Sequence, residues 1–149
     1  MKENRYKFNA VCLKGEIYVL GGRGGRCRDR DNNLITYSVE KYSPFSKTWE
    51  KVAEIPGRSY YISACAYRSE IYIFGVGKFS TRSFNSSCLQ FITEGDYPLK
   101  YSFQKRAEMH DSRMSAACAV YDEKVVVSGG NCYNDALNTV ESYNFTIDT

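Results

Sequence analysis

Three copies of one short segment recur along this chain at a constant interval. The copies are apolar runs that end at glycine, and they lie at Ile17–Gly22, Ile71–Val76 and Val125–Gly130. Their first glycines, Gly21, Gly75 and Gly129, are equally spaced. Self-similarity at a fixed interval is the signature of repeat architectures, in which each unit buries its apolar surface against the next unit. The interval therefore predicts three similar structural units in tandem.

A second apolar run precedes each copy and is joined to it by a short polar turn. These runs lie at residues 10–13, 64–67 and 118–121, and the turns lie at 14–16, 68–70 and 122–124. Two apolar runs joined in this way predict a β-hairpin. An arginine precedes the first glycine at the same distance in repeats one and three, at Arg5 and Arg113, and one residue out of step in repeat two, at Arg58.

Aromatic residues mark the second half of the repeat. Tyr42 and Trp49 follow the glycines of repeat one, Phe103 stands one repeat interval after Trp49, and repeat three reaches Thr149 one residue before the corresponding position. Each unit thus predicts four short strands, with the fourth missing from the third unit. The expected strands lie near 8–13, 16–21, 35–42 and 48–53, near 62–67, 70–75, 87–92 and 101–106, and near 116–121, 124–129 and 139–145.

The second strand of each unit is expected to be covered on both faces. In repeat one, Ile17 and Val19 alternate with Tyr18 and Leu20, so neither face is polar. A strand that is apolar on both faces is typical of a buried position. Neighbouring units stacked face to face would supply that cover.

These residues resemble the Kelch repeat of β-propellers over nearly the whole chain. The resemblance rests on the Gly-Gly after an apolar strand, the tyrosine of the third strand and the tryptophan about seven residues later. It implies an all-β fold of Kelch-type propeller blades, with repeats at 5–57, 58–112 and 113–149, the last lacking its outer strand. It also implies that Trp49 and Phe103 are buried between blades.

The number of repeats predicts a partial propeller. Propellers close with about 4–8 blades, so three units leave apolar faces and strand edges open. We therefore expect either a fragment of a larger propeller or one half of a six-bladed assembly formed by two chains. The segment Ser43–Trp49 looks most like Kelch proteins that carry an N-terminal BTB domain.

The residue inventory argues against catalysis. The chain has one histidine, His110, which excludes a histidine triad or a multi-histidine metal site, and it has no Cys-x-x-Cys pair. The glycine-rich stretch at 21–25 lacks the Lys-Ser/Thr ending of a phosphate-binding loop. We therefore expect no enzymatic activity, no metal and no cofactor, and we interpret His110 as a loop residue.

Charge and hydropathy restrict the classes of partner. The net charge of +3 is too small to indicate nucleic acid or membrane binding by itself. No apolar run is long enough to span a membrane, and Met1–Arg5 leads into no signal-peptide apolar region. We expect a cytoplasmic protein that binds neither nucleic acid nor membranes and keeps its six cysteines reduced.

The most informative segment for function follows the glycines of repeat one. Four arginines, Arg23, Arg26, Arg28 and Arg30, lie within eight residues in the expected loop between strands two and three. Arginine pairs bidentately with carboxylates and phosphates. In similar Kelch propellers the loops on this face bind partners, often acidic peptide segments. The alternative is a solvated loop that Asp29 and Asp31 partly neutralise.

Other residues are expected on the same face as this loop. Exposed aromatic residues beside arginine are typical of interface hot spots. For the two tyrosines that precede strand one of repeat two, packing where that blade begins is an equally good interpretation. The candidates are Tyr60, Tyr61, Arg82, Asn131, Tyr133 and Asn134.

The function implied by the resemblance is non-catalytic protein binding. The chain is similar to the substrate-recognition propeller of a cullin-type ubiquitin ligase adaptor, whose partner is another protein. Self-association that completes the ring is a further expectation. The alternative is an actin-binding, cytoskeletal Kelch protein, and co-sedimentation with actin filaments would distinguish the two.

Overall fold

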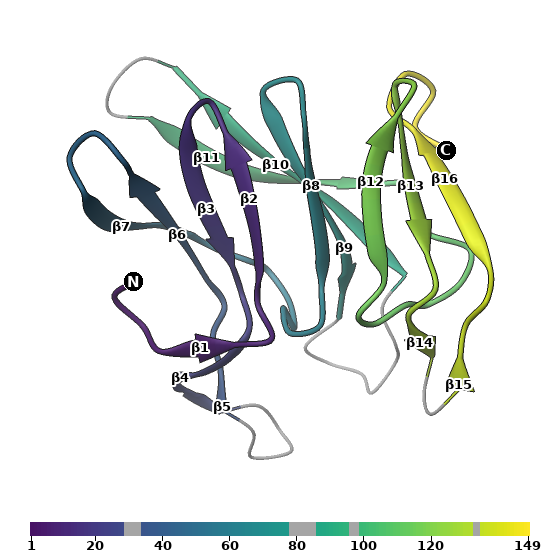
Figure 1. Ribbon diagram of the computed structural model, residues 1–149, viewed down its shortest axis with the longest axis horizontal. Helices are drawn as coiled ribbons and strands as arrows, with labels where there is room; N and C mark the ends of the chain where they lie inside the picture. The colour runs from purple at the N-terminus through teal and green to yellow at the C-terminus, as the bar shows by residue number, and fades with distance from the viewer. Residues whose placement is uncertain (29–33, 78–85, 96–98, 133–134) are drawn as a thin grey trace.

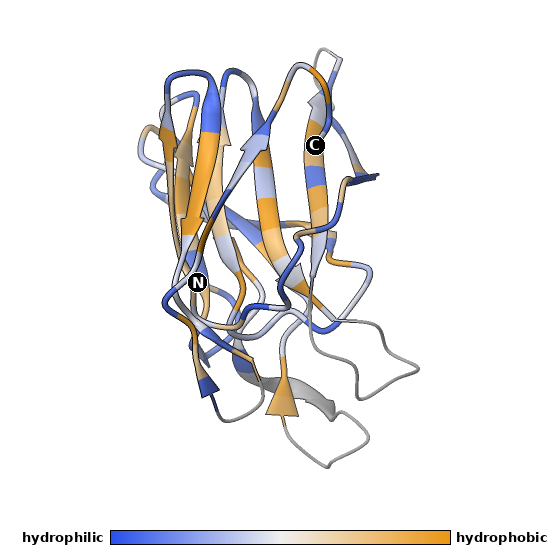
Figure 2. Ribbon diagram, turned by 90° about the vertical axis from the view of Figure 1, so that its right-hand side faces the viewer, coloured by the Kyte–Doolittle hydropathy of each residue, from blue (hydrophilic) through white to orange (hydrophobic). Residues whose placement is uncertain are grey.

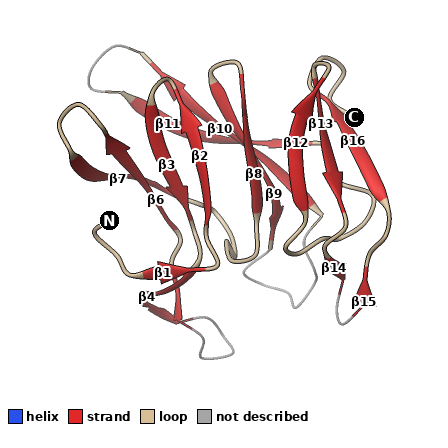
Figure 3. Cartoon of the chain, viewed as in Figure 1, coloured by secondary structure: helices blue, strands red, loops and turns tan. Residues whose placement is uncertain are grey.

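The chain folds into three small antiparallel sheets that stand side by side (Figure 1). The computed structural model describes residues 1–28, 34–77, 86–95, 99–132 and 135–149, and for residues 25–28 it describes the backbone alone. Every regular element within these ranges is a β-strand (Figure 3). The predicted all-β fold of propeller blades is therefore confirmed.

Each sheet corresponds to one repeat, and we call the sheets blades 1, 2 and 3. Blade 1 holds β2 (Asn9–Leu13), β3 (Glu16–Leu20), β6 (Ser38–Ser43) and β7 (Thr48–Glu54). Blade 2 holds β8 (Ser63–Tyr67), β9 (Glu70–Val76), β10 (Ser87–Glu94) and β11 (Lys100–Arg106). Blade 3 holds β12 (Ala117–Tyr121), β13 (Lys124–Ser128) and β16 (Val140–Asn144).

Second-strand residues that are one repeat interval apart pair with the corresponding residue of the third strand in each blade. Val19 pairs with Glu40, Ile73 with Leu89, and Val127 with Glu141. Because a one-residue slip would move every side chain to the opposite face, this shared register fixes which residues of each blade meet the next blade.

Two further sheets lie where loops were predicted. Strand β4 (Arg23–Arg28) pairs with β1 (Arg5–Tyr6) and β5 (Leu34–Ile35), while β14 (Asn131–Cys132) pairs with β15 (Asp135–Ala136). The expectation that the arginine-rich segment is a loop is therefore wrong for Arg23–Arg28. Glycine permits the pairing, because a Cβ on Gly24 would lie 2.4 Å from the carbonyl oxygen of Asn4.

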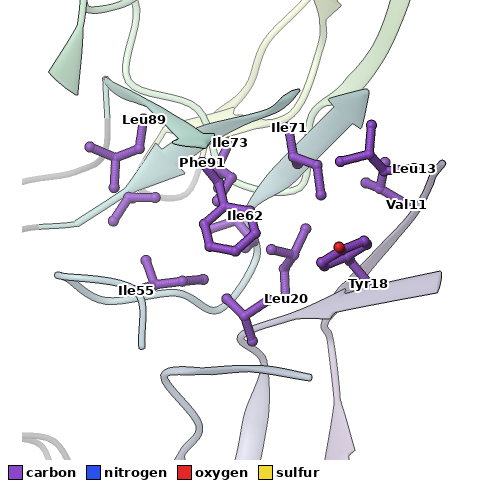
Figure 4. Packing of buried hydrophobic residues seen from close by; sticks show 12 residues of the cluster. Val11, Leu13, Tyr18, Leu20, Ile55, Ile62, Ile71, Ile73, Leu89 and Phe91 are labelled. Carbon is purple, nitrogen blue, oxygen red and sulfur yellow. The ribbon is translucent and has the colours of Figure 1, made fainter. Parts of the chain in front are cut away.

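The hydrophobic core lies between the blades. One cluster joins blades 1 and 2 through residues such as Leu20, Ile73 and Phe91 (Figure 4). A second cluster joins blades 2 and 3 through residues such as Phe74 and Val127. Hydrophobic residues are concentrated along the strands, and hydrophilic ones at the turns (Figure 2). The sheets are thus held together by apolar burial between their faces.

Cover on both faces of the second strand is found only in the middle blade. Ile71 through Val76 are all buried in β9. In β3, by contrast, Ile17 is 39% exposed, and in β13 Val126 is only half-buried. Within this chain, blades 1 and 3 have a neighbouring blade on one side only. The prediction therefore holds for the blade that has two neighbours.

The predicted burial of Trp49 is wrong for the same reason. Its ring packs against Tyr42, with the ring centroids 5.0 Å apart, on the face of blade 1 that no other blade covers. Phe103 occupies the same repeat position in blade 2 and packs against the cluster between blades 1 and 2. Phe103 is itself only partly buried, because it lies on β11, at the outer edge of its sheet.

Candidate partner-binding face

The glycine end of β3 meets the start of blade 2 at one end of the molecule. This end carries β1, β4, β5, β14 and β15, at the bottom of Figure 1. The N–H of Gly22 donates to the carbonyl oxygen of Ser59 over 2.8 Å. A Cβ on Gly21 would lie only 2.1 Å from the same oxygen, so glycine is required where the two blades meet.

Three residues at this end repeat the same unusual backbone conformation. Lys7, Tyr61 and Ser115 stand at equivalent repeat positions and have φ angles of 54°, 61° and 55°. The N–H of Tyr61 donates to the carbonyl oxygen of Lys7 over 3.4 Å, and the N–H of Ser115 donates to that of Tyr61 over 2.8 Å. Residues other than glycine rarely adopt a positive φ angle. We call these two backbone hydrogen bonds the ladder between blades. They fix the direction in which the side chains of Lys7 and Tyr61 leave the backbone.

Two cations and two tyrosines meet where blades 1 and 2 adjoin. Lys7 Nζ donates to the hydroxyl of Tyr61 over 2.6 Å and lies 4.7 Å from its ring centroid. The Arg23 guanidinium lies over the ring of Tyr60, 5.6 Å from its centroid. The two tyrosine rings meet edge to face, with centroids 5.3 Å apart. We call Lys7, Arg23, Tyr60 and Tyr61 the Lys7–Arg23 cluster.

The cluster is electrostatically positive. The hydrogen bond from Lys7 lowers the pKa of the Tyr61 phenol, burial opposes that shift, and Arg23 adds to it. A phenol that is more acidic than usual reports a positive local potential. Lys7 is exposed and Arg23 is half-buried. The cluster therefore offers cationic donors beside aromatic surface.

The structure brings together part of the predicted set. Arg23, Tyr60 and Tyr61 are in contact within the cluster. Asn131 lies at the same end of blade 3, where its backbone exchanges two hydrogen bonds of 2.9 Å with Met114. Arg26 and Arg28 lie on β4, and only their backbones are described. The remaining candidates, Arg30, Arg82, Tyr133 and Asn134, lie outside the described residues.

Lys7 is the cluster member that was not predicted. It is a single lysine between Tyr6 and Phe8, and its residue type alone carries no signal. Its position does carry one, because Lys7 stands one repeat interval before Tyr61 and therefore occupies the same place in the repeat. Extending the repeat comparison to residue 7 would have found it.

Arg5 and Arg113 lie near this end but are structural. Arg5 Nη1 donates to the carbonyl oxygens of Gly21 and Ser38, both over 2.9 Å. Arg113 Nη1 donates in the same way to Gly129 over 2.8 Å and to Thr139 over 2.9 Å. Both guanidinium groups are buried, so they hold the end of strand two against the start of strand three.

The described residues offer few groups for other chemistry. Within these ranges no group of three His, Cys, Asp or Glu residues could hold a metal ion. His110 is exposed and lies between β11 and β12, in agreement with the prediction of a loop residue. In the part of the chain that the structure describes, no helix is long and apolar enough to cross a membrane.

Comparison with protein families identifies the repeat. The Kelch motif matches residues 4–56 and 112–149, which together are more than half of the chain. The chain belongs to the Kelch family. The match leaves out blade 2, in which Ser59 and Leu89 stand where the other two blades have the buried arginine and its glutamate.

Curated relatives of these Kelch repeats are much longer proteins. Kelch-like protein 35 of Mus musculus is 34% identical over 77 residues, which cover 50% of this chain and 12% of that protein. Kelch repeat and BTB domain-containing protein 3 of Homo sapiens is 33% identical over 87 residues, with coverage of 58% and 14%. Kelch-like protein 36 of Bos taurus is 23% identical over 144 residues, with coverage of 96% and 21%. The chain thus spans a small part of each relative.

A solved structure shares the arrangement of the Kelch blades. The structure of YjhT matches with a TM-score of 0.73 and 17% sequence identity, covering 95% of this chain and 50% of that chain. At this identity the likeness concerns the fold alone. Blades 1 to 3 therefore match about half of the YjhT chain in fold.

Proposed function

We propose that this chain is a non-catalytic protein-interaction module whose partner binds at the Lys7–Arg23 cluster. The observation that carries the proposal is the convergence of Lys7 and Arg23 on two tyrosines that belong to the next blade. Arginine and tyrosine are enriched among interface hot spots, because they combine directional hydrogen bonding with large apolar surface. The ligand that suits such a site is an acidic peptide segment.

Arg26 and Arg28 belong to the proposed surface because β4 carries them onward from Arg23. Arg30, Arg82, Asn131, Tyr133 and Asn134 are proposed as its flanks on their sequence positions. Charge on this surface would attract an acidic segment from a distance, and the aromatic rings would supply contact after it docks. The affinity should therefore fall as ionic strength rises.

The BTB-containing relatives suggest what such binding is for. One matched relative is named for both Kelch repeats and a BTB domain. We propose that the module recognises a substrate protein in the manner of a cullin-type ubiquitin ligase adaptor. The actin-binding alternative has no observation of its own here, and actin co-sedimentation remains its test.

Fluorescence anisotropy with a labelled acidic peptide tests the binding site. Four glutamates in the peptide supply the charge, and the same peptide with four glutamines is the reference. Arg23→Ala and Lys7→Ala should each weaken binding, whereas Lys14→Ala should not. Lys14 is a matched control, because it lies in the exposed β2–β3 turn at the opposite end of blade 1 (Figure 1). Equal losses for all three variants would mean that net charge alone drives binding.

Self-association is a second proposal, and the open faces of blades 1 and 3 support it. Ile17 on blade 1 is 39% exposed, and Tyr121 on blade 3 is 75% exposed. Ile71 stands one repeat after Ile17, and Leu13 stands two repeats before Tyr121; both belong to the apolar cluster between blades 1 and 2. Two copies joined head to tail would repeat that contact twice.

A further inference from the structure

Blades 2 and 3 adjoin along their first strands, β8 and β12, which lie side by side (Figure 1). Where the two strands begin, the N–H of Ser115 donates to the carbonyl oxygen of Tyr61 over 2.8 Å. Farther along, the hydroxyl of Ser63 donates to the carbonyl oxygen of Ala116 over 2.6 Å. These two contacts fix the position of β8 against β12.

This arrangement brings two cysteines together between the blades. Side chains two residues apart on a strand lie on the same face. Cys65 therefore lies on the face of β8 from which Ser63 reaches blade 3, and Cys118 follows Ala116 on the facing side of β12. Cys65 belongs to the hydrophobic cluster between blades 2 and 3, and Cys118 packs against that cluster. A hydrogen bond joins the two thiols.

The equivalent contact between blades 1 and 2 contains no thiol. One repeat interval before Cys65 and Cys118 stand Val11 and Ala64. Val11 belongs to the cluster between blades 1 and 2, and Ala64 packs against that cluster. Two ordinary apolar residues thus fill this place at one junction, so packing alone does not account for two facing cysteines at the other.

The two thiols differ in acidity. Their hydrogen bond raises the pKa of Cys65, and burial adds to that shift. The same hydrogen bond lowers the pKa of Cys118, although burial opposes the change. Cys118 is also the more accessible of the two, since it is half-buried whereas Cys65 is buried. Because the thiolate is the reactive form of cysteine, Cys118 is the nucleophile and Cys65 is the thiol beside it.

We propose that Cys65 and Cys118 form a disulfide on exposure to hydrogen peroxide, so that oxidation links blade 2 to blade 3. The Cys118 thiolate attacks one peroxide oxygen, an S–O bond forms, the O–O bond breaks, and the leaving hydroxide takes up a proton to become water. The Cys65 sulfur then attacks the sulfenic acid, an S–S bond forms, and the S–O bond breaks. The second hydroxide leaves with the Cys65 proton as water. The two sulfurs lose the two electrons that the peroxide gains.

A dithiol reductant would return both cysteines to thiols by thiol–disulfide exchange, with its own sulfurs left as a disulfide. While it lasts, the link between Cys65 and Cys118 restricts the unfolded chain and should make the oxidised protein more stable. The proposal uses no residue of the Lys7–Arg23 cluster and is independent of the proposed function.

Peptide mapping of the full chain tests the link. The protein is treated with hydrogen peroxide, remaining thiols are blocked with iodoacetamide, and trypsin digestion follows without reduction. Trypsin releases Cys65 in peptide 59–68 and Cys118 in peptide 114–124, each with a single cysteine. The expected product is a disulfide between these two peptides, formed within one chain on a non-reducing gel and lost with dithiothreitol.

Variants that carry the residues of the other junction assign the two roles. Cys65→Val and Cys118→Ala each introduce the side chain found one repeat interval earlier, and thermal melts of the reduced proteins check that both fold. Cys65→Val should leave Cys118 as a sulfenic acid that dimedone traps. Cys118→Ala should lower dimedone labelling of Cys65 at least about tenfold relative to that of Cys118. Oxidation should raise the Tm of the wild type by at least about 5 °C and leave the Tm of both variants unchanged.

Two results would contradict the proposal. Peptides 59–68 and 114–124 recovered with free thiols, at a peroxide concentration that oxidises the exposed Cys12, would show that the facing pair is unreactive. A disulfide between Cys65 and Cys88, which lies in the same cluster, would show that a different pair of thiols reacts.

Discussion

Arg5 and Glu40 form an ion pair inside blade 1, with only 0% and 1% of their side chains exposed. Blade 3 has the equivalent pair, in which Arg113 Nε donates to Glu141 Oε1 over 3.0 Å. In blade 2 the two positions hold Ser59 and Leu89, so the arginine and the glutamate are both absent. A buried charge without its partner is strongly destabilising, which explains why the two residues occur together or not at all.

Replacing the ion pair of the first blade by the serine and leucine of the second blade tests this relationship. Arg5→Ser or Glu40→Leu alone should each lower the free energy of unfolding by about 3–5 kcal/mol, because each removes the buried, oppositely charged partner of a buried charge. The double variant should lose less than either single variant. Urea denaturation of the four proteins measures the coupling. Strictly additive losses would show that the two side chains act independently.

The repeat interval predicted the blades because it reports equivalent positions. Each expected strand of the three blades is present, and the register is the same from blade to blade. The interval does not indicate whether a neighbouring blade covers a given residue. Trp49 and Phe103 are equivalent in sequence, yet only Phe103 has a neighbouring blade to pack against.

The candidate site was predicted only in part, for two physical reasons. Strand β4 consists of arginine, glycine and cysteine, which carry little β-propensity, and its pairing depends on the close backbone approach at Gly24. Lys7 reaches Tyr61 because of the ladder between blades, which no local pattern encodes. The sequence did predict that Arg23, Tyr60 and Tyr61 share one end of the molecule. The alternating direction of the strands is enough to bring their segments there.

The difference between Phe103 and Trp49 should appear in stability. Phe103→Ala removes a ring from the cluster between blades 1 and 2 and should cost about 3 kcal/mol. Trp49→Ala removes a ring that packs on Tyr42 at an uncovered face, so the loss should be roughly half as large. Chemical denaturation of both variants compares them directly. A larger loss for Trp49→Ala would show that the face of blade 1 is covered in solution.

The thiol of Cys88 should make the protein sensitive to alkaline pH. Burial raises the pKa of Cys88 to about 12, and the nearby Asp148 carboxylate adds to the shift. In the unfolded chain a cysteine titrates near about 8.5. The unfolded state therefore loses its proton first, and the contribution of Cys88 to stability is present below about pH 8.5 and declines as the pH rises towards about 12.

Urea denaturation at pH values between about 8 and 10 measures this decline. Alkylation by iodoacetamide tests the burial of Cys88 that causes it. At a pH of about 8.5 the exposed Cys12 should react rapidly, whereas Cys88 should react only as fast as the protein opens. Mass spectrometry of digested samples distinguishes the two sites. Cys88 labelled as quickly as Cys12 in the folded protein would show that the core between blades 2 and 3 is open to solvent.

Head-to-tail association should depend on the open faces of the first and third blades. Ile17→Lys or Tyr121→Glu places a charge on one of these faces and should hold the protein as a monomer at micromolar concentration in light scattering. Phe45→Lys is the control, because Phe45 is a large apolar residue that is 99% exposed in the turn between β6 and β7 and lies outside the strands that form the two faces. The wild type and the control should both associate.

Mixing the two charged variants separates ring closure from other modes of association. In a ring of two different copies, one joint would place the introduced lysine against the introduced glutamate, and the other would keep the native Ile17 and Tyr121. Opposite charges at the first joint attract each other, so the mixture should recover the dimer that neither variant forms alone. Association between two copies of the same face cannot be rescued in this way. A mixture that stays monomeric, while the wild type forms dimers, would exclude the head-to-tail arrangement.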